Sequence, residues 1–168
     1  MHWYEKPDHF PGAADDLDLR ECVQQARIHL PTELGEIIAR LEGWMRFLGY
    51  PRRDIFAVQL TLYEAANNAF RHGNRGDPAK EVRISFLVTP DEALVSVEDQ
   101  GRGFDPDLVP SPRDEEIPDG PGGLGLQLMR VCTTWMSFDP PGNRVTFCRR
   151  RSDAQVPRLP GPHGPAEA

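Results

Sequence analysis

Two stretches of the chain repeat their apolar residues with the period of an α-helix. The first starts at Thr32, and Gly49 stands where this helix should stop. The second runs from about Arg53 to Arg71. Because residues three and four apart share one side of a helix, each stretch predicts a helix with one buried face. The apolar positions are Leu34, Ile37, Ile38, Leu41, Trp44, Met45 and Leu48 in the first helix, and Ile55, Val58, Leu62, Ala65, Ala66 and Ala69 in the second.

Further along the chain the apolar period changes to two, which is the period of a β-strand. Residues 81–88 and 93–99 alternate in this way, and a turn at 89–92 joins them into a hairpin. Residues 135–150 predict a second hairpin around a Pro-Pro-Gly-Asn turn. A further strand is plausible at 22–30, before the first helix. The apolar positions of the first hairpin are Val82, Ile84, Phe86, Val88, Ala93, Val95 and Val97.

The order of these elements decides the fold class. Between the hairpins lie a proline-rich and acidic loop, residues 104–121, and then a helix that starts with "GGLGLQLMR". A loop of this length within a compact domain is usually a lid or disordered. The whole order is strand, two helices, hairpin, loop, helix, hairpin. It predicts an α+β fold, in which helices pack on one face of a mixed, mostly antiparallel sheet to form a two-layer sandwich.

Composition fits a single soluble domain. The chain has 168 residues, of which 39% are hydrophobic and 27% charged. We expect an irregular arm at 1–18, the folded domain at 19–151, and a disordered Pro/Gly-rich tail at 152–168. The start of the chain lacks the apolar core of a signal peptide, and no apolar run approaches the roughly 18 residues of a membrane span. A cytoplasmic protein without a membrane partner is the expectation.

Charge and cysteines exclude several kinds of function. A net charge of −7 argues against nucleic acid as a main partner, because binding it needs a basic face. The basic run 149–151 is interpreted as a solvated chain end. The odd number of cysteines, without CxxC spacing, indicates neither a disulfide framework nor a zinc site. Cys132 and Cys148 have apolar neighbours and are predicted to be core residues.

Two glycine-rich segments have the character of a ligand site. In "DQGRGF", Asp99 is followed by Gly101 and Gly103, as in a tight turn around a ligand, and its carboxylate could accept a hydrogen bond from an exocyclic amine. In "GPGGLGLQLMR", residues 120–130, glycines leave backbone N–H groups free at a helix start, which suits phosphate. No G-K-[ST] follows, so this is not a Walker A loop. Taken singly, an ordinary turn and an ordinary helix start explain these segments equally well.

The second helix carries unexpected polar residues in "LYEAANNAFRHGN", residues 62–74. Asparagine is a poor residue for a helix interior, yet Glu64 and Asn68 are four apart and therefore share one side. The Asn68 amide oxygen could supply one ligand to a magnesium ion, which keeps several waters. Glu64 could orient or deprotonate a nucleophile near a γ-phosphate. As isolated residues, however, a solvated polar face explains them better.

Together, in this order and spacing, the three segments resemble the Bergerat-fold ATP-binding domains of histidine kinases, gyrase, Hsp90 and the mismatch-repair protein MutL. "LTLYEAANNAFRHGN" resembles the Asn-containing box of the small anti-sigma factor serine kinases. "VEDQGRGFDP" and "GGLGLQLMR" resemble the two glycine boxes that follow it. The resemblance covers roughly residues 22–150.

The resemblance implies a role for each matching residue. Glu64 would be the general base, Asn68 would bind Mg²⁺ and nucleotide, and Asp99 would bind the adenine of ATP. The pair His72-Gly73 matches the end of the family's helix, and we interpret it as structural. The glycines implied in nucleotide binding are Gly101, Gly103, Gly122, Gly123 and Gly125.

The implied function is that of an ATP-dependent serine/threonine protein kinase of the anti-sigma factor type. Such a kinase binds a sigma factor, phosphorylates an anti-anti-sigma antagonist of the STAS type, and can form a homodimer. The glutamate of the Asn-containing box and the free-standing domain favour this class over the detached catalytic domain of a histidine kinase. A non-enzymatic, ATP-dependent module that sequesters a protein partner remains the main alternative.

The chain departs from the family pattern at three points. Asn143 stands where many members have a threonine near the adenine. Gly120 and Pro121 stand where many members have a basic residue that reaches the γ-phosphate. The loop at 104–121 is also unusually acidic, which disfavours triphosphate at close range. ATP binding is therefore a firmer expectation than phosphotransfer.

Overall fold

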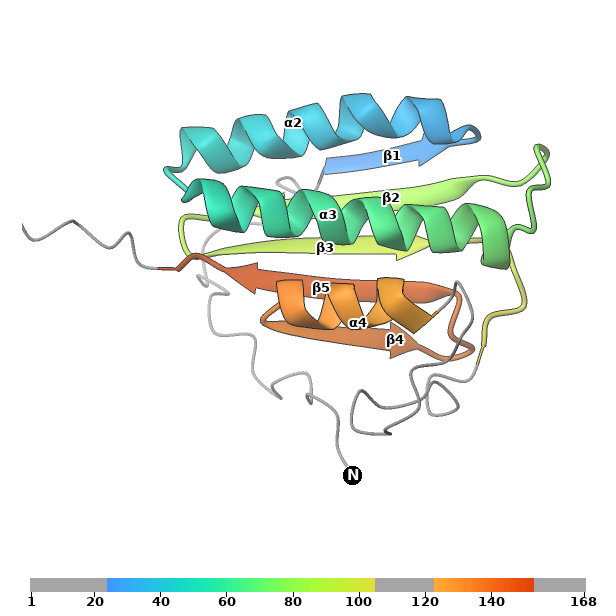
Figure 1. Cartoon of the computed structure of the whole chain (residues 1–168). Coiled ribbons are helices and arrows are strands. Elements are labelled where there is room, and N and C mark those ends of the chain that lie inside the picture. Colours follow the sequence, from blue (N-terminus) through green and yellow to red (C-terminus); the bar gives the residue numbers. More distant parts are fainter. Residues whose placement is uncertain (1–23, 105–122, 153–168) are drawn as a thin grey trace, which may run out of the picture.

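The computed structural model describes residues 24–104 and 123–152 (Figure 1). The elements follow the predicted order. They are β1 (Gln24–Ile28), a 3-10 turn (Pro31–Glu33), α2 (Leu34–Phe47), α3 (Arg52–Asn68), a π-helical turn (Ala69–Gly73), β2 (Val82–Val88), β3 (Glu92–Glu98), α4 (Gly123–Cys132), β4 (Trp135–Asp139) and β5 (Arg144–Arg150). The first helix ends at Phe47, just before the predicted glycine, and Gly49 then adopts φ +77°, which a residue with a Cβ rarely does.

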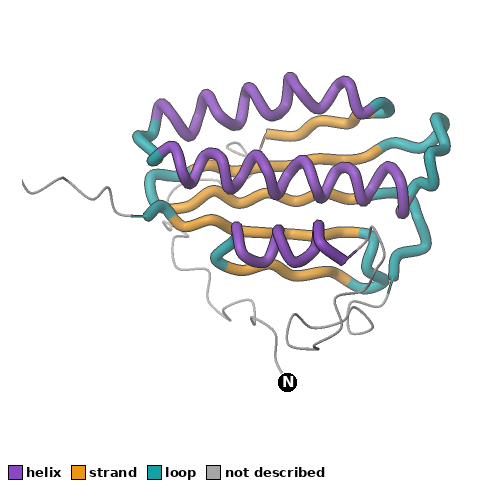
Figure 2. Tube along the Cα trace, viewed as in Figure 1, coloured by secondary structure: helices purple, strands orange, loops and turns teal. Residues whose placement is uncertain are grey.

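The five strands form one sheet in the order β1-β2-β3-β5-β4. Every pairing among the described strands is antiparallel, so the expected mixed, mostly antiparallel sheet contains no parallel pair in this part of the chain. The helices α2, α3 and α4 cover one face of the sheet (Figure 2). The predicted α+β, two-layer architecture is confirmed. The helix α4 connects β3 to β4 in the chain. The last strand, β5, then pairs with β3, so β4 lies at the edge of the sheet.

The core lies between the helices and this face of the sheet. Cross-strand pairs such as Ile84–Val97 and Val95–Phe147 point towards the helices and are almost fully buried. All predicted apolar positions of α3 are buried. Trp44 is the exception in α2, because it is 47% exposed and packs edge-to-face on the ring of Phe47 instead of on the sheet.

The structure corrects the interpretation of the basic run at 149–151. Arg150 and Arg151 are exposed, but the guanidinium of Arg149 lies on the helix side of the sheet. Its Nε and Nη2 atoms donate to Oδ1 of Asp54, at 2.9 and 2.7 Å, and Asp54 is fully buried. The alternation of β5 accounts for the difference, because every second residue of the strand faces the helices. Arg149 is therefore one partner in a buried ion pair.

The two cysteines of the described region differ in burial. Cys148 is buried, as predicted, and burial raises the pKa of its thiol to about 12. Cys132 is only half-buried. The predicted arm, most of the loop at 104–121 and nearly all of the tail lie outside the described residues. Among the helices that are described, none has both the length and the apolar character that crossing a bilayer requires.

Candidate nucleotide-binding site

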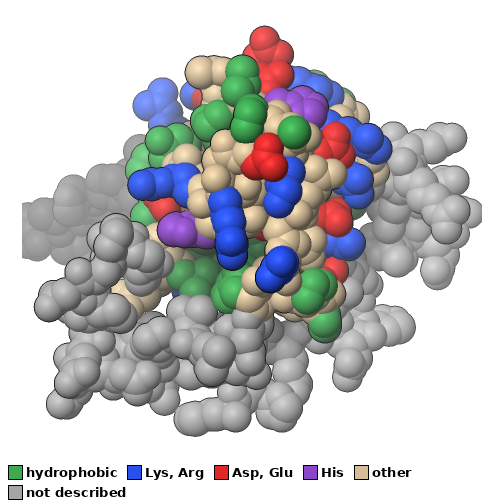
Figure 3. All heavy atoms as spheres, turned by 90° about the vertical axis from the view of Figure 1, so that its right-hand side faces the viewer, with side chains coloured by type: hydrophobic (Ala, Val, Ile, Leu, Met, Phe, Trp, Pro, Cys, Tyr) green, Lys and Arg blue, Asp and Glu red, His purple; other side chains and the backbone are tan. Residues whose placement is uncertain are grey.

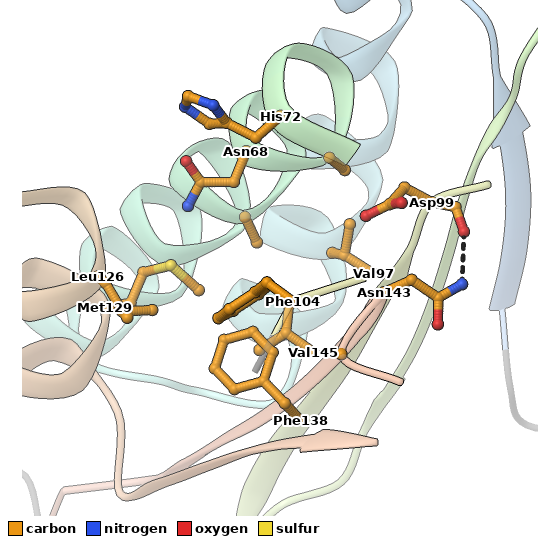
Figure 4. A pocket seen from close by; sticks show the side chains of 13 residues that line it. Asn68, His72, Val97, Asp99, Phe104, Leu126, Met129, Phe138, Asn143 and Val145 are labelled. Carbon is orange, nitrogen blue, oxygen red and sulfur yellow. Dashed lines mark hydrogen bonds between the residues drawn. The ribbon is translucent and has the colours of Figure 1, made fainter. Parts of the chain in front are cut away.

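A cavity of about 250 Å³ opens between α3, α4 and the adjoining ends of the strands (Figure 4). Its walls are mostly apolar, with a few polar side chains converging on them. This composition is typical of small-molecule sites. The lining residues are Ala65, Asn68, Ala69, His72, Val97, Asp99, Phe104, Leu126, Met129, Phe138, Gly142, Asn143 and Val145.

The end of α3 brings two polar side chains to the cavity. After Asn68 the chain continues as the π-helical turn, in which the backbone N–H of Asn74 donates to Ala69 at 2.7 Å. Such turns are wider than an α-helical turn and occur often at functional sites. Asn68 and His72 lie side by side as a result (Figure 4). The Asn68 side chain makes no hydrogen bond within the described residues, so its amide oxygen is available to a ligand.

Asp99 lies at the opposite side of the cavity, where β3 ends. The backbone N–H of Gly101 donates to its Oδ1 at 2.7 Å. A Cβ on Gly73 would overlap the Asp99 carboxyl group, and a Cβ on Gly101 would overlap the carbonyl oxygen of Gly73. Glycine at both positions therefore lets the end of α3 close onto Asp99. Burial raises the pKa of Asp99, although the Gly101 hydrogen bond and nearby Lys80 act in the opposite direction.

Two asparagine side chains hold these segments in register. Asn74 is 1% exposed, donates to the carbonyl of Glu81 at 3.0 Å and accepts from the N–H of Gln100 at 2.9 Å. Asn143 donates to the backbone carbonyl of Asp99 at 2.8 Å and accepts from its N–H at 2.9 Å through its own carbonyl (Figure 4). Asn143, where the family often has threonine, thus fixes the backbone that presents the Asp99 carboxylate.

Close backbone contact also builds the aromatic wall of the cavity. Gly103 and Gly142 both have left-handed φ angles, +75° and +92°. A Cβ on Gly103 would overlap the carbonyl of Pro141, and one on Gly142 would overlap that of Phe104. This contact between the loop after β3 and the β4–β5 turn places the ring of Phe104 edge-to-face on Phe138, with centroids 5.0 Å apart. Gly103 therefore shapes the cavity without lining it.

Glu64 lies beside the cavity and does not line it. Its side chain is half-buried, and its Oε2 is 2.7 Å from the position that a Cβ on Gly125 would occupy. Gly123 and Gly125 are in the first turn of α4, so the predicted base meets the second glycine segment. The structure thus brings Glu64, Asn68 and Asp99 around one site. Gly122 lies outside the described residues.

Some features of the site go beyond the roles that the sequence predicts. His72, for which the sequence predicts a structural role, lines the cavity, and its spacing of four from Asn68 is the signal that the sequence offers. Gly73 makes the close approach to Asp99. The Phe104–Phe138 pair had no sequence signal, because the two residues are far apart in the chain and their contact depends on the fold of two turns.

Comparison with known proteins shows the family of this chain. Residues 29–149 match the histidine kinase-like ATPase domain. The chain belongs to this family. The predicted resemblance is therefore confirmed on most of the ATPase domain, including the stretch that carries Glu64 and Asn68.

The ATPase domain is also similar to individual kinases. It is 35% identical over 125 residues to the serine-protein kinase RsbW of Bacillus licheniformis. The aligned region covers 71% of this chain and 74% of that protein. With RsbW of Bacillus pumilus it shares 32% identity over 125 residues, covering 70% and 75%. With RsbW of Bacillus subtilis it shares 34% over 109 residues, covering 60% and 67%. The kind of enzyme expected from the sequence agrees with the names of these relatives.

Proposed function

We propose that the protein is a cytoplasmic, ATP-dependent serine/threonine protein kinase of the anti-sigma factor type. It binds a sigma factor and phosphorylates an anti-anti-sigma protein of the STAS type. Its similarity to serine-protein kinases over about seven-tenths of the chain supports this proposal. The observation that carries it is the position of Glu64 against the first turn of α4, next to a cavity with the apolar walls and few polar groups of a small-molecule site.

The residues around the cavity fit an adenine nucleotide. The Asp99 carboxylate can accept a hydrogen bond from the exocyclic amine of the base, while the apolar walls cover its faces. The glycine-rich start of α4 offers backbone N–H groups to phosphate. Asn68 would hold a magnesium ion through its amide oxygen, and such an ion neutralises phosphate charge during transfer.

In this arrangement Glu64 takes the proton from the hydroxyl of the protein substrate. The side chain makes no hydrogen bond or ion pair within the described residues, so its carboxylate is available for that proton. Phosphoryl transfer proceeds through a loose transition state, for which positioning matters more than the strength of the base.

The main alternative is a module that binds ATP and sequesters a partner without phosphorylating it. Transfer of label from the γ-phosphate of ATP to a purified anti-anti-sigma protein separates the two. We expect transfer by the unaltered protein and a loss of about a hundredfold or more in Glu64→Gln, in the range of general-base contributions. Glu36→Gln is the matched control, because Glu36 is an exposed glutamate on α2. Transfer that survives Glu64→Gln would exclude Glu64 as the base.

Calorimetric titration of Mg-ATP separates the nucleotide site from the chemistry. Glu64→Gln should bind Mg-ATP with nearly the affinity of the unaltered protein. Asn68→Ala should lose affinity by about tenfold or more, since it removes the metal ligand. If the protein binds Mg-ATP but transfers no label to the antagonist, the sequestering module is the correct function. If it does not bind Mg-ATP at all, both functions fail.

A further inference from the structure

The end of the molecule that carries the cavity is locally basic. Two neighbouring segments, 71–80 and 100–104, contain four lysine and arginine residues and one acidic residue, Asp77, a net charge of +3 on a chain whose net charge is −7. Figure 3 looks onto this end of the molecule, and Lys and Arg side chains gather around its centre. We call these four cations the basic rim: Arg71, Arg75, Lys80 and Arg102.

The fold brings the two segments of the basic rim together. The Asn74 side chain accepts from Gln100, and the backbone of Gly101 lies against that of Gly73. Both segments also supply cavity residues, His72 from the first and Phe104 from the second. The four cations themselves do not line the cavity. They belong to the same two segments as the lining residues His72 and Phe104, so they lie close in the chain to the cavity without forming its wall.

Within the described residues the three arginines of the basic rim form no ion pair, unlike their neighbours on the sheet, whereas Lys80 lies near the Asp99 carboxylate. Arg27 and Arg83 pair with Glu81 at 3.7 and 3.6 Å, and Arg144 pairs with Glu98 at 3.5 Å. Within the described residues the rim side chains make neither an ion pair nor a hydrogen bond. The three arginines are exposed. Their charge is therefore not used by the fold of the described part of the chain.

Arg75 adopts a backbone conformation that is uncommon for residues with a side chain. Its φ is +57°, in the left-handed region, and Gly76 follows at φ +70°. Hydrogen bonds on both sides enforce the turn, from Asp77 N–H to Asn74 and from Gly76 N–H to Phe70. Glycine would adopt this conformation without strain, whereas arginine does so at a cost. An exposed arginine in a strained position, with no ion-pair partner in the described part of the chain, favours a binding role over a structural one.

We propose that the basic rim is a docking surface for an acidic segment of the protein substrate. This inference rests on the proposed kinase function, because the substrate must bring its hydroxyl to the mouth of the cavity, beside Glu64 and the start of α4. Complementary charge accelerates encounter and fixes the orientation of the bound partner. The acidic character of the whole chain disfavours nucleic acid as the occupant.

The direct test is binding of a short fluorescent peptide of alternating glutamate and serine, followed by anisotropy. Binding should be detectable at low ionic strength and weaken as salt is added. The double variant Arg75→Glu/Arg102→Glu should bind about tenfold or more weakly. Arg52→Glu is the control, because Arg52 is also exposed but lies in the first turn of α3, at the opposite end of the helix from the cavity. A peptide of lysine and serine should not bind.

A second variant separates docking from folding. Arg75→Gly removes the charge and relieves the strain of the left-handed backbone. Its urea midpoint should therefore equal or exceed that of the unaltered protein, while its affinity for the acidic peptide should be lower. Arg75→Lys should retain most of the peptide affinity. Equal peptide binding by Arg75→Gly, Arg75→Glu/Arg102→Glu and the unaltered protein would overturn the proposal. Tighter binding of a DNA duplex than of the peptide would also overturn it.

Mg-ATP titration of the same proteins keeps this inference apart from the proposed function. The rim variants should still bind Mg-ATP, and Arg75→Gly should do so with nearly unchanged affinity, because Arg75 does not line the cavity and this substitution adds no negative charge near the phosphates. With the antagonist protein as substrate, they should raise KM more than they lower kcat. If Mg-ATP binds and label is transferred but the rim variants leave KM unchanged, the kinase stands and the docking surface is wrong. If Mg-ATP does not bind, the kinase fails whatever the peptide does.

Discussion

At the scale of single residues, the site depends on how closely two backbones approach Asp99. Gly73 ends the π-helical turn, and its backbone lies against the carboxyl group that we assign to adenine recognition. The space is so narrow that a single methyl group at residue 73 would occupy the place of the carboxylate. The absence of a side chain is therefore part of the binding geometry.

Gly73→Ala should consequently damage nucleotide binding more than folding. The new Cβ displaces the Asp99 carboxylate from the cavity, and we expect the affinity for Mg-ATP to fall by about tenfold or more in calorimetric titration. Gly35→Ala is the matched control, since a Cβ at residue 35 has open space around it. Nearly equal affinities for Mg-ATP in both variants would mean that Asp99 does not contact the nucleotide.

The Asp99 carboxylate should lower the stability of the protein at pH 7 and increase its affinity for Mg-ATP. Burial raises its pKa, so the folded state favours the protonated form. The raised pKa stabilises the folded state below the pKa of the unfolded chain, and this stabilisation is lost as the pH rises through the folded pKa. At pH 7 the desolvated carboxylate of Asp99 therefore lowers the free energy of unfolding. Asp99→Asn should therefore raise the urea midpoint at pH 7 and lower the affinity for Mg-ATP. A lower urea midpoint at pH 7 would contradict this account.

At the scale of elements, α2 contains a glycine that lowers the stability of the helix. Gly43 lies inside this helix on its exposed side, and a Cβ there would meet nothing within 4 Å. Glycine within a helix costs about 1 kcal/mol relative to alanine, because more backbone entropy is lost on folding. Gly43→Ala should raise the free energy of unfolding by about that amount in urea titration, with Mg-ATP affinity unchanged. A loss of stability would show that α2 makes a close contact on this side.

The elements themselves could be predicted from the sequence because each has a periodic apolar face. A slip of one residue in β3 would turn Val95 and Val97 to the outer face of the sheet, so the alternation also fixes the hairpin register. The helix break at Gly49 could be predicted for a similar local reason, since glycine tolerates a positive φ.

Features that join distant segments could not be predicted in this way. The π-helical turn has no periodic signal, and the meeting of Gly73 with Asp99 follows from where α3 and β3 end in the folded sheet. Trp44 has the spacing of a buried residue but lies outside the helix–sheet contact. The three candidate boxes could be recognised, but their side chains come together only through tertiary packing.

At the scale of the whole molecule, a buried polar cluster connects the first turn of α3 to the end of β5. Arg149 donates to Oδ1 of Asp54, while the N–H and hydroxyl of Ser152 donate to Oδ2 at 2.7 and 2.6 Å. All of these groups are separated from Asp54 by more than ninety residues of chain. The cluster fixes one end of the helix whose other end carries Asn68, and so links global stability to the position of the site.

This cluster should control the acid stability of the protein. Burial acts to raise the pKa of Asp54, but hydrogen bonds from Ser152 and the hydrogen bonds and charge of Arg149 outweigh it and hold the pKa below its usual value. The stabilisation is therefore complete above the pKa of the unfolded chain, about 3.9, and is lost as the pH falls through the lower folded pKa. Urea midpoints measured from pH 7 downwards should fall in the acid range for the unaltered protein.

Asp54→Asn isolates this contribution from those of the other carboxylates. The substitution leaves the partly buried Arg149 charge without its counter-ion, so at pH 7 we expect a loss of roughly 3 kcal/mol in the free energy of unfolding, at the low end for a buried pair because Arg149 keeps some contact with water. The difference from the unaltered protein should shrink as the pH falls and Asp54 becomes protonated, because both proteins then present a neutral group to Arg149. Asp91→Asn, at an exposed carboxylate near the same end of the sheet, should leave the pH profile unchanged. A constant difference at all pH values would mean that the cluster stabilises by packing alone, and that the charge of Asp54 contributes nothing.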